Sequence, residues 1–283
     1  MQGRIVKAIS GFYYVENENK IYECKARGIF KKNSITPLVG DFVEFEEFKN
    51  GKGNVIDVKE RKNSLVRPPI ANIDTAIIVA AVKNPDISLL FIDKQIVFLE
   101  SIGVEPVICI NKIDIESGEK IKSIYKNIGY SVIDTSAINE IGIEELKEKI
   151  KNKVSVFIGN SGVGKSSLTN KIIGSSIMEE GDLSKIERGK QTTRHVELIR
   201  LEDNTYIADS PGFSSFEIIP EENLDNYFIE FQQYICDCRY RGCNHVLEEE
   251  CGIRYAVEAG KIEKSRYESY CVLKNAKKQN KYE

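Results

Sequence analysis

Residues 154–171 read VSVFIGNSGVGKSSLTNK, and this stretch decides the fold of the chain. An apolar run typical of a buried strand leads into a glycine-rich loop, which opens a segment of helical character. The loop fits the pattern G-x-x-x-x-G-K-[ST] in the strand–loop–helix context that a phosphate-binding loop requires. The sequence therefore predicts a nucleotide-binding α/β domain built on a parallel sheet.

The loop is expected to hold phosphate groups. Its glycines let backbone amides turn toward phosphate oxygens, and the N-terminus of the following helix adds a positive end. Lys165 is expected to neutralise the β- and γ-phosphates, and Ser166 to ligate Mg²⁺. The nucleotide-binding residues predicted from the loop are Gly159, Asn160, Ser161, Gly162, Val163, Gly164, Lys165, Ser166 and Ser167.

A second motif, Asn111-Lys112-Ile-Asp114, is suited to selecting the base. It follows the apolar residues VICI, so it would lie at the edge of the sheet where ligands bind. A carboxylate can accept two hydrogen bonds from guanine, at N1–H and at the exocyclic amine, and adenine does not offer that pair. The stem of Lys112 can pack against the base. Ser136 and Ala137, after the strand-like YSVID, would present a backbone amide to guanine O6.

Two further segments are predicted to sense the γ-phosphate and Mg²⁺. Asp209-Ser-Pro-Gly212 follows the strand-like TYIA, so Asp209 can hold Mg²⁺ through water and the Gly212 amide can touch the γ-phosphate. Thr192 and Thr193 lie in a polar stretch that suits a loop ordered by bound nucleotide. Thr193 is the better candidate for the hydroxyl that ligates Mg²⁺.

The group that positions the attacking water is the least determined part of the predicted site. Many GTPases carry a glutamine directly after D-x-x-G, but this chain has Phe213, whose ring cannot orient water by hydrogen bonding. Gln191 and His195 are the local candidates. The predicted catalytic residues are Lys165, Thr193, Gln191 and Gly212.

The order of these motifs is reversed with respect to a usual GTPase, in which the phosphate loop comes first and the base reader near the end. Here the base reader precedes the phosphate loop, and D-x-x-G follows both. This order is a circular permutation, which is allowed because the termini of a domain often lie close together at its surface. The permuted domain is predicted to span residues 68–215. We hypothesise that its D-x-x-G segment, which leads into the cysteine-rich region, moves that region when γ-phosphate binds.

The segments on either side differ in character. Residues 1–67 read as five short strands rich in Val, Ile, Phe and Tyr, which predicts a small β-barrel of the OB or SH3 type. In the C-terminal segment, 216–283, residues 221–234 are expected to be helical, and residues 255–281 to form two helices broken near Gly260. The predicted fold class is therefore multidomain, with a barrel, a permuted α/β GTPase domain and a helical C-terminal domain.

The C-terminal segment carries a cluster of soft ligands, Cys238-x₄-Cys243-x-His245-x₅-Cys251. Three thiols and one imidazole suit tetrahedral Zn²⁺ with no open position, which is a structural site rather than a catalytic one. Cys236 is an alternative to Cys238. The C-terminal domain is therefore predicted to bind zinc.

The bulk composition restricts the partners and the compartment. Lys and Arg number 40 against 43 Asp and Glu, a net charge of −3, which excludes a uniformly basic nucleic-acid coat. Contact with a polyanion must therefore be local. The first residues lack the apolar core of a signal peptide, and no apolar run approaches the ~20 residues of a membrane span, so we expect a cytoplasmic protein without membrane contact.

On these motifs the chain resembles the RsgA (YjeQ/YloQ) family of circularly permuted GTPases over nearly its whole length. The marks are Asn111–Asp114 ahead of GNSGVGKSSL (159–168), DSPGF (209–213), and the Cys/His spacing, which in this family selects Cys238. The resemblance implies an OB-type barrel that contacts ribosomal RNA, hydrolysis stimulated by the small (30S) ribosomal subunit, and a role in late maturation of that subunit. The expected cofactors are one structural Zn²⁺ and Mg²⁺ with GTP, and we expect a monomer.

The chain departs from that family at Gln191, where a histidine is usual. An amide can orient water but cannot act as a base. A nucleotide-gated RNA-binding adaptor with negligible turnover is one alternative, favoured by Phe213. A tRNA-directed GTPase is another, because phosphate contacts carry no sequence information. A small-molecule kinase would share the phosphate loop but would not need the base reader.

Overall fold

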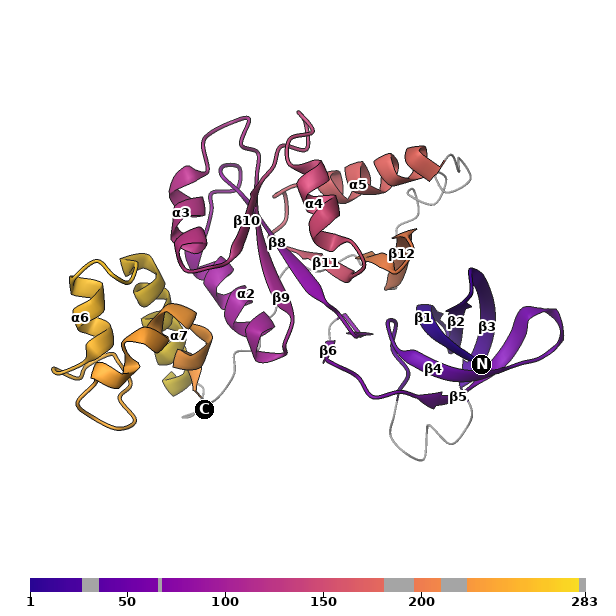
Figure 1. The fold of residues 1–283 in the computed structure, drawn as a ribbon, viewed down its shortest axis with the longest axis horizontal. Helices are drawn as coiled ribbons and strands as arrows, with labels where there is room; N and C mark the ends of the chain where they lie inside the picture. Colours follow the sequence, from indigo (N-terminus) through magenta and orange to yellow (C-terminus); the bar gives the residue numbers. More distant parts are fainter. Residues whose placement is uncertain (27–35, 66–67, 181–195, 210–222, 280–283) are drawn as a thin grey trace.

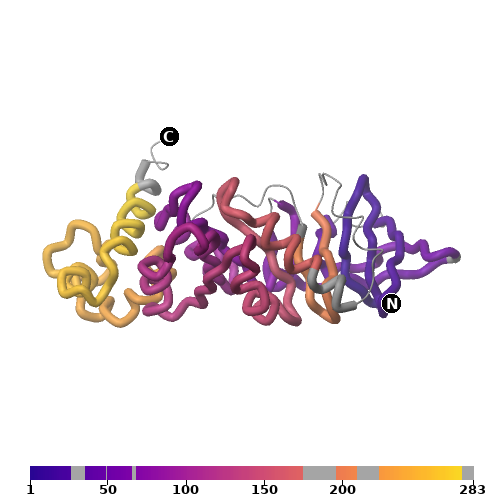
Figure 2. Tube along the Cα trace, turned by 90° about the horizontal axis from the view of Figure 1, so that it is seen from above, coloured from indigo at the N-terminus to yellow at the C-terminus, as the bar shows by residue number. Residues whose placement is uncertain are grey.

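The computed structural model describes residues 1–26, 36–65, 68–180, 196–209 and 223–279 of the 283-residue chain (Figure 1). The molecule is elongated, with a barrel at one end, an α/β body in the middle and a small helical body at the other end. Figure 2 shows these three parts following one another along the long axis. Among the described residues, no helix is long and apolar enough to cross a membrane.

Five strands form the N-terminal barrel: β1 (Gln2–Ile9), β2 (Phe12–Asn17), β3 (Lys20–Ala26), β4 (Phe42–Glu47) and β5 (Lys52–Val58). They pair in the order β1-β2-β3-β5-β4, and β4 also pairs with β1, which closes the barrel. Only β3 and β5 run parallel, as in a five-stranded Greek-key barrel of the OB type. Ile5, Val15, Phe45 and Val55 are fully buried, so the predicted barrel is confirmed.

The central body is a six-stranded sheet covered on both faces. Its strands are β8 (Thr75–Ala81), β9 (Glu105–Asn111), β10 (Ser131–Asp134), β11 (Val154–Ile158), β12 (Glu197–Glu202) and β13 (Thr205–Asp209), in the order β10-β9-β8-β11-β13-β12. All neighbours are parallel except β12, which runs antiparallel to β13. The helices are α2 (Leu89–Ser101), α3 (Glu119–Asn127), α4 (Ile143–Ile150) and α5 (Lys165–Glu180).

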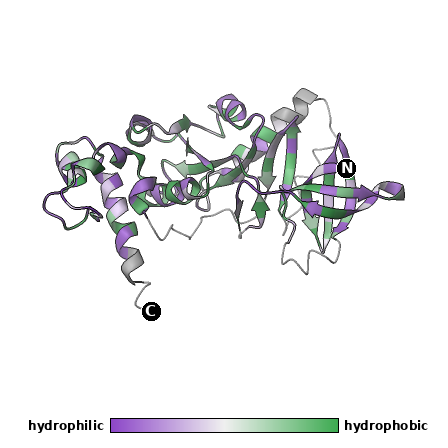
Figure 3. Cartoon of the chain, turned by 60° about the horizontal axis from the view of Figure 1, so that its bottom comes forward, coloured by the Kyte–Doolittle hydropathy of each residue, from purple (hydrophilic) through white to green (hydrophobic). Residues whose placement is uncertain are grey.

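Alternation along the strands explains the two helix layers. Ile78 of β8 packs in one hydrophobic cluster with residues of α2 and α3, whereas its neighbour Ile77 packs in another with residues of α4 and α5. Successive side chains of a strand point to opposite faces, so a strand buried on both sides is almost entirely apolar, as TAIIVAAV is after Thr75. Figure 3 shows these central strands as largely hydrophobic.

The barrel and the central sheet are joined into one eleven-stranded sheet, an arrangement that the sequence did not predict. Strand β1 of the barrel pairs with β12, with Lys7 opposite Glu197. Between the barrel and β8, the short strands β6 (Ser64–Leu65) and β7 (Ile70–Ala71) form a separate small ladder. The barrel is therefore attached to the strand pair β12–β13.

The C-terminal body contains the 3-10 helices η3 (Leu224–Tyr227), η4 (Ile229–Gln233) and η5 (Ile235–Asp237), followed by α6 (Gly252–Glu258) and α7 (Lys264–Gln279). Within the segment 221–234, which is expected to be helical, the described residues from Asn223 on form short 3-10 helices rather than one continuous helix. Phe228 leaves the helical region at φ −105° and ψ 85°, and its ring is fully buried beside that of Phe231. Core packing of these rings thus replaces a regular helix with short turns. The break near Gly260, which has a φ of +68°, is confirmed.

Candidate functional site

The phosphate loop and the base reader lie at the same edge of the sheet. Gly159 follows β11 directly, Asn111 is the last residue of β9, and β8 lies between these two strands. All three strands are parallel, so their carboxyl ends meet at one edge, the usual ligand-binding edge of such sheets. The two motifs are therefore brought together although Asn111 and Gly159 lie 48 positions apart in the sequence (159 minus 111).

Glycine is required at two positions of the phosphate loop. Gly159 has a φ of +150°, and a Cβ there would lie 2.2 Å from the carbonyl oxygen of Val79. Gly164 has a φ of +100°, and a Cβ there would lie 2.2 Å from Nδ2 of Asn111. The loop thus packs against both the neighbouring strand and the base reader with no room for a side chain.

Lys165 is held across the loop. Its Nζ donates to the carbonyl oxygens of Gly159 at 2.6 Å and Asn160 at 2.9 Å. Burial lowers the pKa of this ammonium group. Phosphate oxygens placed in the loop would favour the charged form, as any nearby negative charge does.

Asn111 connects the base reader to the phosphate loop. Its Nδ2 donates to the carbonyl oxygen of Val163 at 2.8 Å, and its Oδ1 accepts from the hydroxyl of Thr135 at 3.1 Å. The side chain is buried, and both ends of its amide are engaged. Asn111 therefore holds three segments together: the base reader, the phosphate loop and the loop that follows β10.

Asp114 is exposed and held by a neighbour. Its Oδ1 accepts a hydrogen bond from the hydroxyl of Ser136, which is itself fully buried, and the same hydroxyl accepts from the amide of Asn139 at 3.2 Å. Ala137 follows in the same loop and is partly buried. The carboxylate is thus fixed in direction while open to a base. Lys112, at a φ of +66°, donates through Nζ to the carbonyl oxygen of Asn84.

Several predicted site residues lie outside the described part of the chain: Gln191, Thr192, Thr193, His195, Gly212 and Phe213. Asp209 is the last residue of β13, which pairs in parallel with β11 beside the phosphate loop. The carboxyl end of β13 therefore lies at the same edge of the sheet as the two nucleotide motifs.

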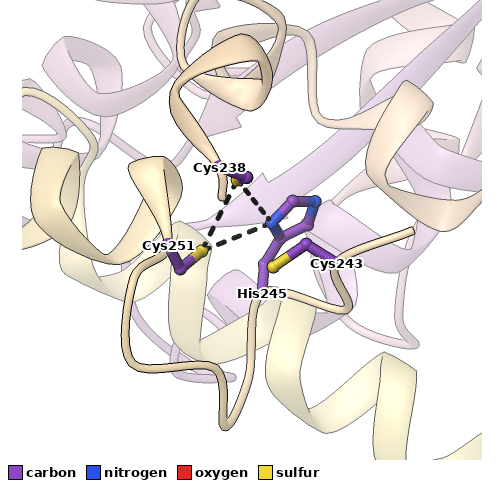
Figure 4. Close-up of side chains that lie close together, drawn as sticks. All are labelled: Cys238, Cys243, His245 and Cys251. Carbon is purple, nitrogen blue, oxygen red and sulfur yellow. Dashed lines mark hydrogen bonds between the residues drawn. The ribbon is translucent and has the colours of Figure 1, made fainter. Parts of the chain in front are cut away.

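The four predicted metal ligands converge in the C-terminal body (Figure 4). The donor atoms of Cys238, Cys243, His245 and Cys251 all lie within 4.8 Å of one another. Nδ1 of His245 lies 3.5 Å from Sγ of Cys238 and 3.4 Å from Sγ of Cys251, and the two sulfurs are 3.9 Å apart. With ordinary bond lengths, tetrahedral zinc would set roughly 3.5 Å between nitrogen and sulfur and roughly 3.8 Å between sulfurs. The donor set therefore fits a tetrahedral metal ion, and Cys236, which is exposed, is not part of it.

Surrounding residues shape the metal-binding loop. The carboxylate of Glu248 accepts hydrogen bonds from the amides of Asn244, Val246 and Leu247 at 2.9 to 3.1 Å, while His245 itself has a φ of +60°. The hydroxyls of two α7 tyrosines hold the carbonyl oxygens on this loop: Tyr267 bonds His245 at 2.8 Å and Tyr270 bonds Asn244 at 2.9 Å. The sequence reasoning missed these supports, although a glutamate three residues after the histidine ligand was a visible signal.

A metal ion at the cluster must displace the protons of buried thiols. Burial raises the pKa of Cys243 to about 12 and also raises the pKa of Cys251. Burial lowers the pKa of His245, which keeps the imidazole neutral as a metal ligand requires. The types of the four ligands and the distances between their donor atoms therefore both fit a bound metal ion.

Comparison with known proteins identifies the family of the chain. A family model described as RsgA GTPase matches residues 58–219, and one described as RsgA N-terminal domain matches residues 2–55. The chain is 48% identical to the small ribosomal subunit biogenesis GTPase RsgA of Caldanaerobacter subterraneus subsp. tengcongensis, over 96% of this chain and 94% of that protein. It is 44% identical to the protein of the same name from Alkaliphilus metalliredigens, over 99% of each.

Solved structures give the same result. YloQ, described as a circularly permuted GTPase, is similar with a TM-score of 0.82 and 35% identity, covering 99% of this chain and 95% of that chain. YjeQ from Thermotoga maritima is similar with a TM-score of 0.84 and 38% identity, covering 97% of each. The resemblance inferred from the motifs is thereby confirmed, and the chain belongs to the RsgA family of circularly permuted GTPases.

Proposed function

We propose that this RsgA-family GTPase binds and hydrolyses GTP at the sheet edge described above, in the service of small ribosomal subunit maturation. The main observation in support of a guanine nucleotide is the hydrogen bond from Asn111, in the base reader, to the carbonyl oxygen of Val163 in the phosphate loop. It couples the phosphate cradle to Asp114, whose direction Ser136 sets. Asp114 accepts from N1–H and the exocyclic amine of guanine, a pair that adenine lacks.

The remaining residues act on the phosphates and on water. The amides of residues 159–167 cradle the phosphate oxygens, and Lys165 neutralises charge on the β- and γ-phosphates. Ser166 and Thr193 would hold Mg²⁺ through their hydroxyls, and Asp209 would hold it through water. The amide of Gly212 would contact the γ-phosphate, and Thr192 would contact the bound nucleotide. Gln191 orients the attacking water through its amide. It would take the role of the glutamine that many GTPases have directly after D-x-x-G, where this chain has Phe213. Bound Mg²⁺ would supply compensation of the negative charge that develops during transfer.

The metal of the C-terminal body is assigned as one zinc ion. Three thiolates and a neutral imidazole are the ligands that structural zinc sites use, and four protein ligands leave no position for a substrate. The ion would hold the loop of residues 238–251 in place rather than take part in hydrolysis. The functional units are residues 1–67, 68–215 and 216–283.

The partner is the small ribosomal subunit and its RNA, which the names of the relatives indicate for those proteins. The barrel is suited to RNA, because OB-type barrels bind nucleic acid with aromatic and basic side chains. One such pair is present: Nζ of Lys25 lies 4.9 Å from the ring centroid of Phe12. The protein would act as a monomer in the cytoplasm, where ribosomes mature.

Two measurements test this function. GTP hydrolysis is followed with and without purified small subunits, and co-sedimentation with small and large subunits is compared under GDP and under a non-hydrolysable GTP analogue. We expect stimulated turnover and tighter binding to the small subunit with the analogue. Analogue-dependent binding without stimulated turnover would instead favour the RNA-binding adaptor, which the loss of the glutamine at Phe213 supports.

A further inference from the structure

A buried arginine joins the C-terminal body to the GTPase domain. Arg266 lies on α7, and its guanidinium group donates to Glu230 of η4, from Nε at 2.8 Å and from Nη2 at 3.2 Å. Its Nη1 donates to Oδ1 of Asp93, on α2, at 2.6 Å. The hydroxyl of Tyr125, on α3, donates to the same Asp93 oxygen at 2.8 Å. One side chain thus links α7 and η4 to α2 and α3.

Stability alone does not account for this cluster. The side chains of Arg266 and Asp93 are fully buried, and that of Glu230 is nearly so. Removing charges from water costs free energy that their attraction only partly returns, and a packed apolar cluster is often equally stable. Two carboxylates share one guanidinium group, and Oδ2 of Asp93 has no hydrogen-bond partner within the described chain. The planar guanidinium group of arginine has several N–H donors in a fixed geometry, so it fixes the orientation of the carboxylates that it binds.

The first helix that Asp93 anchors begins beside the base reader. Residues 82–88 connect β8 to α2, and the Ser88 hydroxyl caps the helix by accepting from the amide of Phe91. Within this connection the carbonyl oxygen of Asn84 accepts the hydrogen bond from Nζ of Lys112. A shift of α2 would therefore move the residue that holds Lys112 in the reader.

The second helix, α3, begins five residues after Asp114. Besides carrying Tyr125, it contacts the other side of the reader, because Nζ of Lys122 lies 2.6 Å from Oδ2 of Asp134. Asp134 ends β10, two residues before Ser136, whose hydroxyl fixes Asp114. The two helices that meet at Asp93 thus both contact the guanine reader: the connection that precedes α2 contacts Lys112, and α3 contacts Asp134.

We propose that Arg266 is a positioning residue for guanine recognition, acting from the C-terminal body through Asp93 on α2 and α3. The inference rests on the proposed role of Asp114 as the guanine reader. Its consequence is that base selection in the GTPase domain depends on a residue more than 150 positions away in the sequence (266 minus 114 is 152).

The test compares the affinities of the full-length protein for GDP and for inosine diphosphate, which lacks the exocyclic amine. Arg266→Met removes the fork, and the double variant Arg266→Met/Glu230→Gln avoids leaving both carboxylates unpaired. Tyr125→Phe removes only the link to α3 and is the mildest change. Arg266→Lys keeps the charge without the fork. Circular dichroism and thermal unfolding establish that each variant is folded.

We expect GDP affinity to fall about 5- to 10-fold in the Arg266→Met variants, within the usual range of coupling between sites. Affinity for inosine diphosphate should fall only about twofold, because Asp114 makes one hydrogen bond fewer to that base. The preference for GDP over inosine diphosphate therefore narrows. Arg266→Lys should restore part of it, and Tyr125→Phe should narrow it less.

Tyr267→Phe is the matched control, because it lies on the same helix and removes a hydrogen bond to His245 without touching Asp93. It should keep the preference of the wild type. The proposal would be overturned if the Arg266→Met variants lost equal affinity for GDP and inosine diphosphate, or if the folded variants kept the GDP affinity of the wild type. It would also be overturned if Tyr267→Phe reduced the preference for GDP as much as Arg266→Met does. A wild-type protein with no preference for GDP over inosine diphosphate would instead overturn the proposed guanine reader.

Discussion

At the scale of single residues, the nucleotide site depends on contacts that leave no space. Asn111 uses both ends of its amide to join the phosphate loop, through Val163, to the loop that carries Thr135. The loop can approach Asn111 this closely only because position 164 is glycine. Sequence motifs identified both residues but could not show that each requires the other, because that contact spans more than fifty positions.

Gly164→Ala should therefore weaken nucleotide binding about tenfold or more. A Cβ at this position would lie 2.2 Å from Asn111 Nδ2 and would force a non-glycine residue to a φ of +100°. Such backbone strain costs about 1–3 kcal/mol. Titration with a fluorescent GDP analogue measures the effect. The same substitution at Gly174, in α5 with no atom within 4 Å of the added Cβ, is the control. It should leave binding intact and stabilise the helix by about 0.5–1 kcal/mol.

Asp114→Asn should exchange guanine for xanthine. Xanthine replaces the exocyclic amine with a carbonyl oxygen, which the amide of asparagine can serve as a donor. GTP affinity should fall about 100-fold or more, while affinity for xanthosine triphosphate should rise. Glu116→Gln neutralises an exposed carboxylate two residues away and should change neither affinity. Equal loss of both nucleotides in the folded Asp114→Asn protein would contradict the assignment of Asp114 as base reader.

At the scale of elements, the C-terminal body departs furthest from what the sequence predicted. The sequence indicated a helical segment over 221–234, and its described part consists of short 3-10 helices, since Phe228 and Phe231 both turn inward to pack on Tyr270. Strands and helices of the central domain were predictable because each repeats a simple pattern of burial. A small core around a metal site is fixed instead by ring packing and metal ligands, which leave no period in the sequence.

Cys238→Ser and Cys236→Ser form a matched pair for the metal site. Only Cys238 lies within the cluster, with Sγ 3.5 Å from Nδ1 of His245. We expect the purified wild type to carry about one zinc ion per chain, the number that a single four-ligand site holds. Cys238→Ser should lose most of it, whereas Cys236→Ser should retain it. Elemental analysis gives the stoichiometry, and an unchanged zinc content in Cys238→Ser would exclude it as a ligand.

Glu248→Gln should weaken the metal-binding loop. Burial opposes the shift, but hydrogen bonds from backbone amides, including those of Asn244, Val246 and Leu247, lower the pKa of Glu248 to about 2. Because the pKa is lowered on folding, the stabilisation is complete above the unfolded pKa of about 4.3 and is lost as the pH falls toward 2. At pH 7 the variant should therefore show the full effect, about 1–3 kcal/mol for hydrogen bonds to a charged group. Thermal unfolding of the zinc-loaded protein measures it, with Glu249→Gln, an exposed neighbour, as control.

At the scale of the whole molecule, the barrel is fastened to the two strands that adjoin the predicted switch segments. Glu16 of β2 accepts from Arg200 of β12 at 2.9 Å and from the hydroxyl of Tyr206 of β13 at 2.8 Å. Arg4 of β1 lies 5.0 Å from the ring centroid of Tyr206. Strand β12 follows residues 181–195, and β13 ends at Asp209. The domain that would contact RNA and the segments that would sense γ-phosphate are thus connected through the same pair of strands.

Glu16→Gln should loosen this connection without unfolding either domain. The amide keeps the shape of the side chain but loses the negative charge that accepts from both Arg200 and Tyr206. For a partly exposed group, we expect this loss to weaken the attachment of the barrel by about 1 kcal/mol. Amides where Lys7 pairs with Glu197 should then exchange hydrogen about five times faster, while those inside the barrel and the central sheet keep their protection. Glu18→Gln, at an exposed position of the same hairpin, should behave as wild type. Unchanged exchange at the β1–β12 pairing would mean that the contacts of Glu16 are not needed to attach the barrel to the central sheet.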